Sequence, residues 1–258
     1  MKPSITVTVS ATRGSVPREA GTSMRVWAAG QDGTIGGGAF EFDAAKHARS
    51  MLETGQNESE RTIPLGPDLG QCCGGSVTLR FSTETTPQDY SAPPLWIWGA
   101  GHVGRALAHV MAPLGDRAIT VIDTTSDRIP SDLPNTVEPL VAADPLRVVG
   151  HAPQNADHII VTYSHKLDLA LCNALLHHGF ASCGLIGSQT KWVRFQKRLN
   201  DMGHTNAQIL RIACPIGDPA LGKHPQAIAI SVSGALICAS ATQKYATPND
   251  LNTGNKTA

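Results

Sequence analysis

A short apolar run leads into three spaced glycines in Pro94-Leu95-Trp96-Ile97-Trp98-Gly99-Ala100-Gly101-His102-Val103-Gly104-Arg105-Ala106-Leu107. This order predicts a strand, a tight turn and a helix. Gly99 would permit the turn, Gly101 the close approach of a phosphate to the backbone, and Gly104 the close packing of the helix on its strand. The first N–H groups of the helix would then face the anion.

The residues around this Gly-x-Gly-x-x-Gly motif support the same interpretation. Val103, Leu107, Val110 and Leu114 recur at helical spacing. A second strand is expected over 118–123, and it ends in Asp123, 19 residues beyond Gly104, where a ribose-binding carboxylate would lie. The pattern indicates the start of a Rossmann-type domain, but a fold does not determine its ligand, so NAD itself does not follow.

Strand and helix patterns alternate through the rest of this region. Strands are expected over 136–142, 157–163 and 182–187, and helices over 167–178, 188–202 and 227–241. Such alternation predicts a doubly wound, mostly parallel sheet, because parallel strands need crossover helices of one hand. We therefore expect a Rossmann-like domain over 95–245 and a polar tail over 246–258.

A different pattern precedes this domain. Strands are expected over 5–9, 24–27 and 76–81, a turn over 30–33, and an amphipathic helix over 42–55. Three glycine-rich loops, at 14–21, 36–38 and 70–75, separate them. The polar, proline-containing segment 87–94 predicts a linker, so 1–86 forms a small mixed α+β domain.

Composition excludes several classes of function. The 258 residues include 21 basic and 21 acidic side chains, so no net field favours nucleic acid or an anionic membrane. No apolar run approaches the roughly 18 residues that a membrane span requires. The first residues alternate like a strand and lack the apolar core of an export signal. These features predict a cytoplasmic protein.

Taken together, the motifs resemble the XdhC/CoxI family, the xanthine dehydrogenase accessory proteins. The matching blocks follow the family's order along almost the entire chain: Gly14-Ser15-Val16-Pro17-Arg18-Glu19-Ala20-Gly21, Thr34-Ile35-Gly36-Gly37-Gly38, Gly70-Gln71-Cys72-Cys73-Gly74-Gly75, Gly99-Ala100-Gly101-His102-Val103-Gly104, Gly184-Leu185-Ile186-Gly187-Ser188 and Cys214-Pro215-Ile216-Gly217. One block departs from the family: its Thr-His-x-His type segment is Thr162-Tyr163-Ser164-His165 here, so only His165 of the histidine pair is carried over.

The resemblance implies a cofactor-binding chaperone of purine catabolism. Such a protein would bind the molybdenum cofactor (molybdopterin), protect it while its terminal sulfido ligand is installed, and deliver it to apo xanthine dehydrogenase or a related molybdenum hydroxylase. A cysteine desulfurase is a further implied partner, and we expect a homodimer. The alternative is an NAD(P)-dependent oxidoreductase that uses the same glycine turn.

The expected cofactor-binding residues come from both domains. Gly99, Gly101 and Gly104 would hold the phosphate of molybdopterin, with His102 as a donor at the start of the helix. Asp123 would accept from a ribose diol or a pterin amine. The remaining candidates are Arg13 and Arg18 as an oxyanion clamp, Gly37 and Gly38 as closely approached backbone, His165, and Cys72 and Cys73 as soft ligands to molybdenum.

Other polar and sulfur residues fit structural roles. Cys172, Cys183 and Cys238 lie in apolar runs that predict core positions, whereas Cys214 stays undecided. Lys191, Arg194 and Arg198 share one helical face, which predicts a solvated surface or, as a second option, a docking surface. No Ser/His/Asp spacing or carboxylate pair appears, so independent catalysis is poorly supported.

Overall fold

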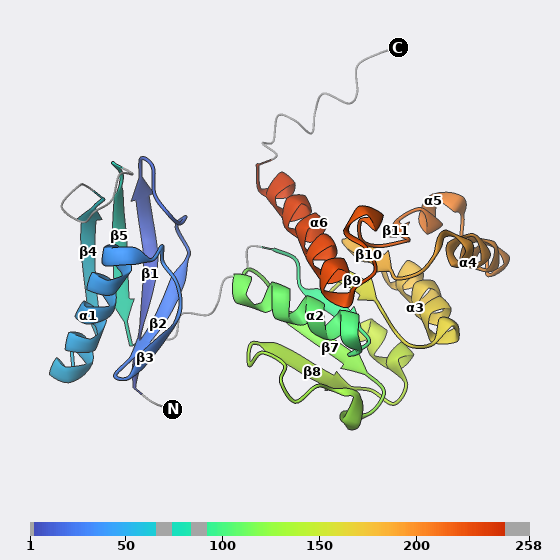
Figure 1. Cartoon of the computed structure of the whole chain (residues 1–258), viewed down its shortest axis with the longest axis horizontal. Coiled ribbons are helices and arrows are strands. Elements are labelled where there is room, and N and C mark those ends of the chain that lie inside the picture. Colours follow the sequence, from blue (N-terminus) through green and yellow to red (C-terminus); the bar gives the residue numbers. More distant parts are fainter. Residues whose placement is uncertain (1–2, 66–73, 84–91, 246–258) are drawn as a thin grey trace, which may run out of the picture. The chain divides into compact units, whose positions relative to one another are not determined.

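The chain divides into two compact units, residues 1–89 and 90–258. The computed structural model describes residues 3–65, 74–83 and 92–245, and their side chains as far as residue 241 (Figure 1). Most of the predicted linker, Cys72, Cys73 and the predicted tail lie outside the described residues.

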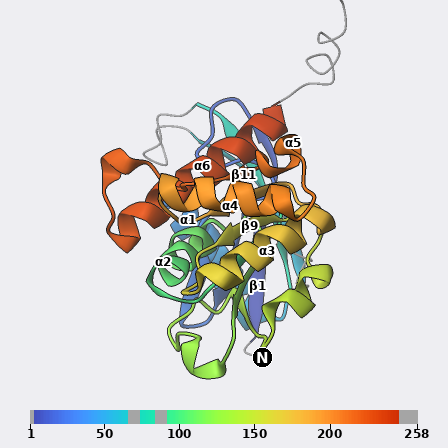
Figure 2. The same ribbon diagram turned by 90° about the vertical axis from the view of Figure 1, so that its right-hand side faces the viewer.

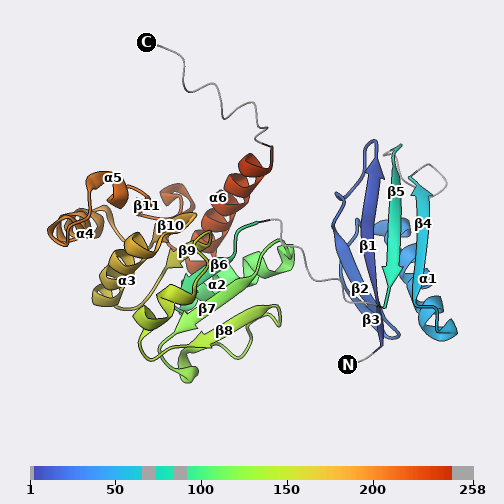
Figure 3. The ribbon, with the colours of Figure 1, turned by 180° about the vertical axis from the view of Figure 1, so that it is seen from behind.

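The N-terminal unit is an antiparallel sheet with one helix. Its five strands have the order β3-β2-β1-β5-β4. The helix, α1 (Gly38–Thr54), packs on one face of this sheet (Figures 1 and 3). The strands are β1 (Ser4–Arg13), β2 (Ser23–Trp27), β3 (Gly30–Gly33), β4 (Glu58–Pro64) and β5 (Ser76–Ser82).

Buried apolar residues alternate with outward-facing residues along β1, and this pattern explains how the sheet packs on the helix. Ile5, Val7 and Val9 are buried against α1, while the residues between them face outward. The prediction of a turn over 30–33 is wrong, because these residues pair with β2 as an edge strand. The turn is made by the two residues between Trp27 and Gly30. Hydrogen bonding to β2 outweighs the local preference of Gly30 and Gly33 for a turn.

The C-terminal unit is the predicted Rossmann-like fold. Its six strands are all parallel, in the order β11-β10-β9-β6-β7-β8. Counted from β8, they are the third, second, first, fourth, fifth and sixth strands of the unit, the order typical of dinucleotide-binding domains. The strands are β6 (Leu95–Trp98), β7 (Ile119–Asp123), β8 (Val137–Val141), β9 (Asp157–Ile160), β10 (Ser182–Leu185) and β11 (Ile212–Ala213).

Helices cover both faces of this sheet. On one face, α2 (His102–Met111) lies beside α6 (Pro225–Tyr245) (Figures 1 and 3). On the other face, α3 (His165–His178) lies next to α4 (Gln189–Asp201) (Figure 2). The shorter elements are α5 (Asn206–Ile209), η2 (Ala112–Leu114), η3 (Ser126–Arg128), η4 (Pro145–His151) and η5 (Pro219–Leu221).

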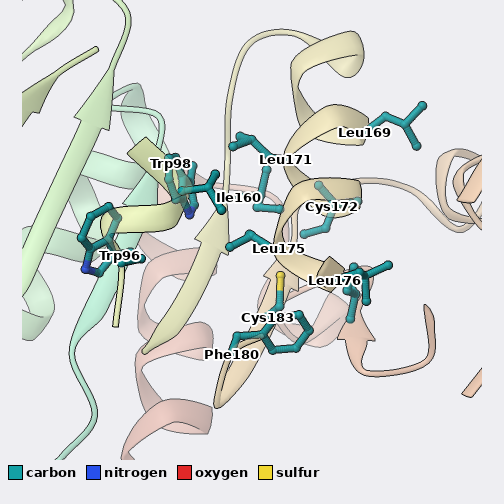
Figure 4. Close-up of a cluster of buried hydrophobic side chains, with 14 of the residues drawn as sticks. Trp96, Trp98, Ile160, Leu169, Leu171, Cys172, Leu175, Leu176, Phe180 and Cys183 are labelled. Carbon is teal, nitrogen blue, oxygen red and sulfur yellow. The ribbon is translucent and has the colours of Figure 1, made fainter. Parts of the chain in front are cut away.

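The first strand of this sheet is buried on both sides. Leu95 and Ile97 pack toward α2 and α6, whereas Trp96 and Trp98 pack toward α3. A central parallel strand needs apolar side chains on both faces, which explains the unbroken apolar run before Gly99. Figure 4 shows the core on the α3 side, where Leu171 and Leu175 gather around Trp98.

A buried charge network lies at the N-terminal ends of the strands, opposite the end that carries Gly99. The side chain of Arg117 is fully buried, and its guanidinium donates to Asp116, Asp157 and Ser240 of α6. Ser182 also donates to Asp157, at 2.5 Å. Removing one partner of such a network would leave an unpaired buried charge and should cost about 3–5 kcal/mol.

The prediction of core cysteines is confirmed for two residues and wrong for one. Cys172 and Cys183 are buried between α3 and the sheet (Figure 4). Cys238 is exposed, because α6 is apolar around most of its circumference and turns only one face to α2. Among the described helices, none is both long and apolar enough to span a membrane.

His158 of β9 is a buried histidine in this core. Its Nδ1 accepts a hydrogen bond from Trp98 Nε1 at 3.1 Å, so the neutral ring carries its proton on Nε2. Nε2 has no partner among the described residues. Burial, with a smaller contribution from His178, lowers the pKa of His158 to about 4. The folded protein therefore keeps this ring neutral at pH values where the unfolded chain protonates it.

We predict that His158 makes the folded protein less stable in acid than at neutral pH. As the pH falls from about 6.5 to about 4, the unfolded chain binds a proton that the folded state does not, and stability falls by as much as about 3 kcal/mol. His158→Gln keeps an acceptor for Trp98 and should lose this part of the pH dependence. Urea unfolding at pH 7 and pH 4.5 measures it, with exposed His151→Gln as control. An unchanged pH dependence in His158→Gln would contradict the prediction.

Candidate functional site

The glycine turn between β6 and α2 lies where the strand order reverses. Two of its glycines are required by packing alone. Gly99 has φ +114°, and a Cβ there would lie 2.7 Å from Val161 O and 3.0 Å from Thr162 Cα. A Cβ on Gly104 would collide with Gly99 O. These two glycines let the turn lie directly against the end of β9 and against its own helix.

Gly101 has no such requirement. It caps the N-terminus of α2 with φ −68°, and nothing lies within 4 Å of the position that a Cβ would occupy. In the described part of the chain, the N–H groups of Gly101, His102 and Val103 make no hydrogen bond. His102 is exposed beside them. The open space and the free donors suit an anion at the positive end of the helix dipole.

Asp123 ends β7 as predicted, and its carboxylate supports the turn. It is only 5% exposed, and Oδ2 accepts from Ala100 N at 2.9 Å. Oδ1 accepts from Thr124 N at 2.7 Å and from Arg128 Nε at 2.8 Å. Oδ1 thus has several donors, whereas Oδ2 has one among the described residues. The role of Asp123 toward a ligand stays a prediction.

Arg128 and Tyr163 form a contact that the sequence did not indicate. The Arg128 guanidinium lies 4.1 Å from the centre of the Tyr163 ring, and Tyr163 is 65% exposed. Together with Asp123 they link η3 to the turn between β9 and α3. Tyr163 also lines a cavity of about 10 Å³ together with Trp98, Gly99 and Thr162 among others, which is space for one water.

His165 lies in the neighbouring turn, at the start of α3. Its side chain is exposed, and Ser164 caps the helix by accepting from Leu167 N at 3.3 Å. His165 and His102 each follow the end of a neighbouring strand, β9 and β6. The fold therefore places both histidines at the edge of the sheet where open α/β sheets bind ligands.

The glycine-rich loops of the N-terminal unit meet at one end of its sheet. Ser15 pairs with Gly74, and a Cβ on Gly75 would collide with the carbonyl oxygens of Ser15 and Arg13. A Cβ on Gly36 would lie 2.6 Å from Pro17 Cγ. Packing between loops of the same unit thus accounts for Gly36 and Gly75, without a ligand.

The carboxylate of Glu41 accepts hydrogen bonds from backbone N–H groups just before α1. Oε2 accepts from Gly37 N at 3.0 Å, Ile35 N at 2.9 Å and Thr34 Oγ1 at 2.5 Å. Burial by itself raises the pKa of Glu41, but these hydrogen bonds outweigh it, so the pKa lies below its ordinary value. A carboxylate of this chain already occupies the Gly37 donor, and Gly38 begins the helix. Ligand binding by Gly37 and Gly38 stays a prediction.

Arg13 and Arg18 are exposed on the same loops. Neither guanidinium has an ionic or hydrogen-bonding partner among the described residues. Oxyanion binding by these two arginines stays a prediction. Cys72 and Cys73, which directly precede Gly74, lie outside the described residues, so their proposed role as molybdenum ligands also stays a prediction.

Three of the four described thiols are poor metal ligands. Burial raises the pKa of Cys172 and Cys183 well above the ordinary range, and raises the pKa of half-buried Cys214 to about 11. Neutral thiols at pH 7 are neither strong nucleophiles nor soft ligands. Within the described ranges, no three His, Cys, Asp or Glu side chains gather as a metal site.

The fold and the turn define the class of this protein: a small sheet-and-helix unit joined in sequence to a Rossmann-type unit with an open glycine turn at the start of its first helix. A family model described as the XdhC Rossmann domain matches residues 95–236. A second model, described as the XdhC and CoxI family, matches residues 2–63. Because the first match covers more than half of the chain, the chain belongs to the XdhC family.

Two known proteins are similar to this chain in sequence or in fold. The uncharacterized protein YqeB of Escherichia coli (strain K12) is 29% identical over 230 residues, which is 87% of this chain. This chain spans 41% of the length of YqeB. A crystal structure described as a xanthine dehydrogenase from Bacillus halodurans has a TM-score of 0.69 at 16% identity, covering 97% of this chain and 95% of the other, and shows a shared fold.

Gly104→Ala should destabilise the C-terminal unit much more than Gly101→Ala. The first places a methyl group on the Gly99 carbonyl and should cost about 3 kcal/mol, whereas the second fills open space at an allowed φ and should stay within about 1 kcal/mol. Thermal and urea unfolding followed by circular dichroism measure both variants. Equal losses of stability would show that steric crowding does not distinguish these glycines.

Proposed function

We propose that this protein is a maturation factor that binds the molybdenum cofactor, holds it while the terminal sulfido ligand is installed, and delivers it to apo xanthine dehydrogenase or a related molybdenum hydroxylase. Membership of the XdhC family supports the maturation role. The molybdenum cofactor, the sulfuration step and the client enzyme belong to the proposal.

The observation that carries the proposal is the unexplained glycine, Gly101. Packing requires Gly99 and Gly104, whereas a Cβ at Gly101 would meet no described atom, so a ligand could approach the backbone at this N-cap. Three backbone N–H groups that have no partner among the described residues begin there. A phosphate fits this position by charge and by hydrogen bonding, and molybdopterin carries a terminal phosphate.

The residues present fit such a ligand. In this proposal the N–H groups of Gly101, His102 and Val103 bind the phosphate, and the exposed imidazole of His102 supplies a further donor. Arg13 and Arg18 offer planar guanidinium groups to oxyanions. When bound, the cofactor supplies the molybdenum centre on which the client enzyme depends. This chain contributes binding and protection, and no described constellation supports chemistry of its own.

The alternative, an NAD(P)-dependent oxidoreductase, is favoured by the strand order and by Asp123 at the end of β7. The hydrogen bonds of Asp123 count against this alternative, because its carboxylate already accepts from Ala100, Thr124 and Arg128. A ribose diol would have to share this almost completely buried carboxylate with these donors. A phosphate at the start of α2 would meet N–H groups that have no partner among the described residues.

The test is binding of molybdopterin and of the same pterin after enzymatic removal of its phosphate. The full-length protein should bind molybdopterin, detected as a fluorescent pterin after oxidative release, and should bind the dephosphorylated form at least about tenfold more weakly. Failure to copurify with or take up molybdopterin would overturn the proposal. Tighter binding of NADPH, with hydride transfer to a substrate, would establish the alternative.

Gly101→Ala should weaken molybdopterin binding by about tenfold or more, because the methyl group occupies the space that the phosphate needs. Gly150→Ala is the matched control, since a Cβ at Gly150 also meets nothing within 4 Å, but this residue lies in η4. It should bind like the wild type. If both variants bind equally well, the glycine turn does not hold the phosphate.

A further inference from the structure

The motif Gly184-Leu185-Ile186-Gly187-Ser188 contacts the side chain and backbone of Lys191. Lys191 Nζ donates to the carbonyl oxygen of Ile186 at 2.8 Å, and Ser188 Oγ accepts from Lys191 N at 3.2 Å. A Cβ on Gly187 would lie 2.7 Å from Lys191 Cδ, so the lysine folds back over this glycine. The prediction of Lys191 on a solvated face is wrong, because its side chain is only 9% exposed.

Lys191 reaches a buried carboxylate on the neighbouring helix. Its Nζ lies 2.6 Å from Oδ2 of Asp168, whose side chain is completely buried in the first turn of α3. The other oxygen, Oδ1, accepts from Thr162 Oγ1 at 2.6 Å. One carboxylate thus links the start of α4 to the turn after β9.

Thr162 holds the turn that borders the candidate ligand site. Its Oγ1 accepts from Ser164 N at 3.1 Å, and its Cα lies where a side chain on Gly99 would collide. The exposed residues Tyr163 and His165 flank the same turn. The series of contacts therefore runs from Lys191 through Asp168 and Thr162 to the glycine turn.

A buried ion pair is an expensive means of stabilising a fold, since apolar residues of similar volume often do at least as well. In this protein, the ion pair holds Asp168 so that its Oδ1 accepts a hydrogen bond from Thr162. We propose that Asp168 and Lys191 are positioning residues, which hold the turn from Val161 to His165 against the glycine turn so that the ligand meets a preformed site. The identity of the ligand rests on the function proposed above.

Two double variants separate positioning from stability. Asp168→Asn with Lys191→Met and Asp168→Leu with Lys191→Met both remove the ion pair without leaving an unpaired charge. The asparagine retains an oxygen that can accept from Thr162, whereas the leucine does not. Thr162→Val, with the ion pair intact, is a third variant that removes only the hydroxyl.

The first readout needs no ligand. In protein labelled with ¹⁵N-glycine, the amide resonances of Gly99 and Gly101 should keep their wild-type positions in the Asn/Met variant and should shift or double in the Leu/Met variant. Unfolding temperatures identify the conditions under which every variant is folded. If both double variants show wild-type glycine resonances, the ion pair serves stability alone and the proposal is overturned.

The second readout is molybdopterin binding. The Leu/Met variant and Thr162→Val should bind about tenfold more weakly, and the Asn/Met variant within about threefold of the wild type. Equal binding by all variants would overturn the positioning role. If the wild type itself binds no molybdopterin, the proposed function fails, while the glycine resonances still decide whether the pair positions the turn.

Discussion

The close approach of two backbone turns at Gly99 is the contact on which the candidate site depends. The turn after β6 lies against Val161 and Thr162 at the end of β9, closer than any side chain on Gly99 would permit. These are the two strands at which the order of the sheet reverses. Because Asp123 binds Ala100 from one side and Thr162 lies on the other, the N-terminus of α2 has a defined position.

The glycines of this chain differ in what surrounds them, and the structure separates three cases. At Gly36, Gly75, Gly99 and Gly104 a side chain would meet backbone or proline atoms, so these glycines serve packing. Gly101 faces open space beside N–H groups that bind no other described residue, and the proposed phosphate would bind here. The glycines before α1 show a third outcome, in which Glu41 of the same chain uses the backbone donor of Gly37.

Much of the architecture could be predicted because its signals are local. The buried run Leu95–Trp98, the glycine spacing and the acid at Asp123 predict the strand, turn and helix that the structure contains. The burial of Lys191 could not be predicted, because its carboxylate partner lies 23 residues away on another helix. Spacing along α4 alone assigns the lysine to a basic surface. The contact between Arg128 and Tyr163 depends in the same way on strand order.

The sequence by itself determined the class of the fold, the family and the location of the glycine turn, since these follow from periodicity, glycine spacing and motifs within short segments. Only the tertiary structure decided which glycine remains open, which donors Asp123 has already bound, and that Lys191 reaches Thr162 through Asp168. The physical reason is that steric space and hydrogen-bond saturation belong to pairs of distant residues. Such pairs come together only when the sheet and its helices assemble.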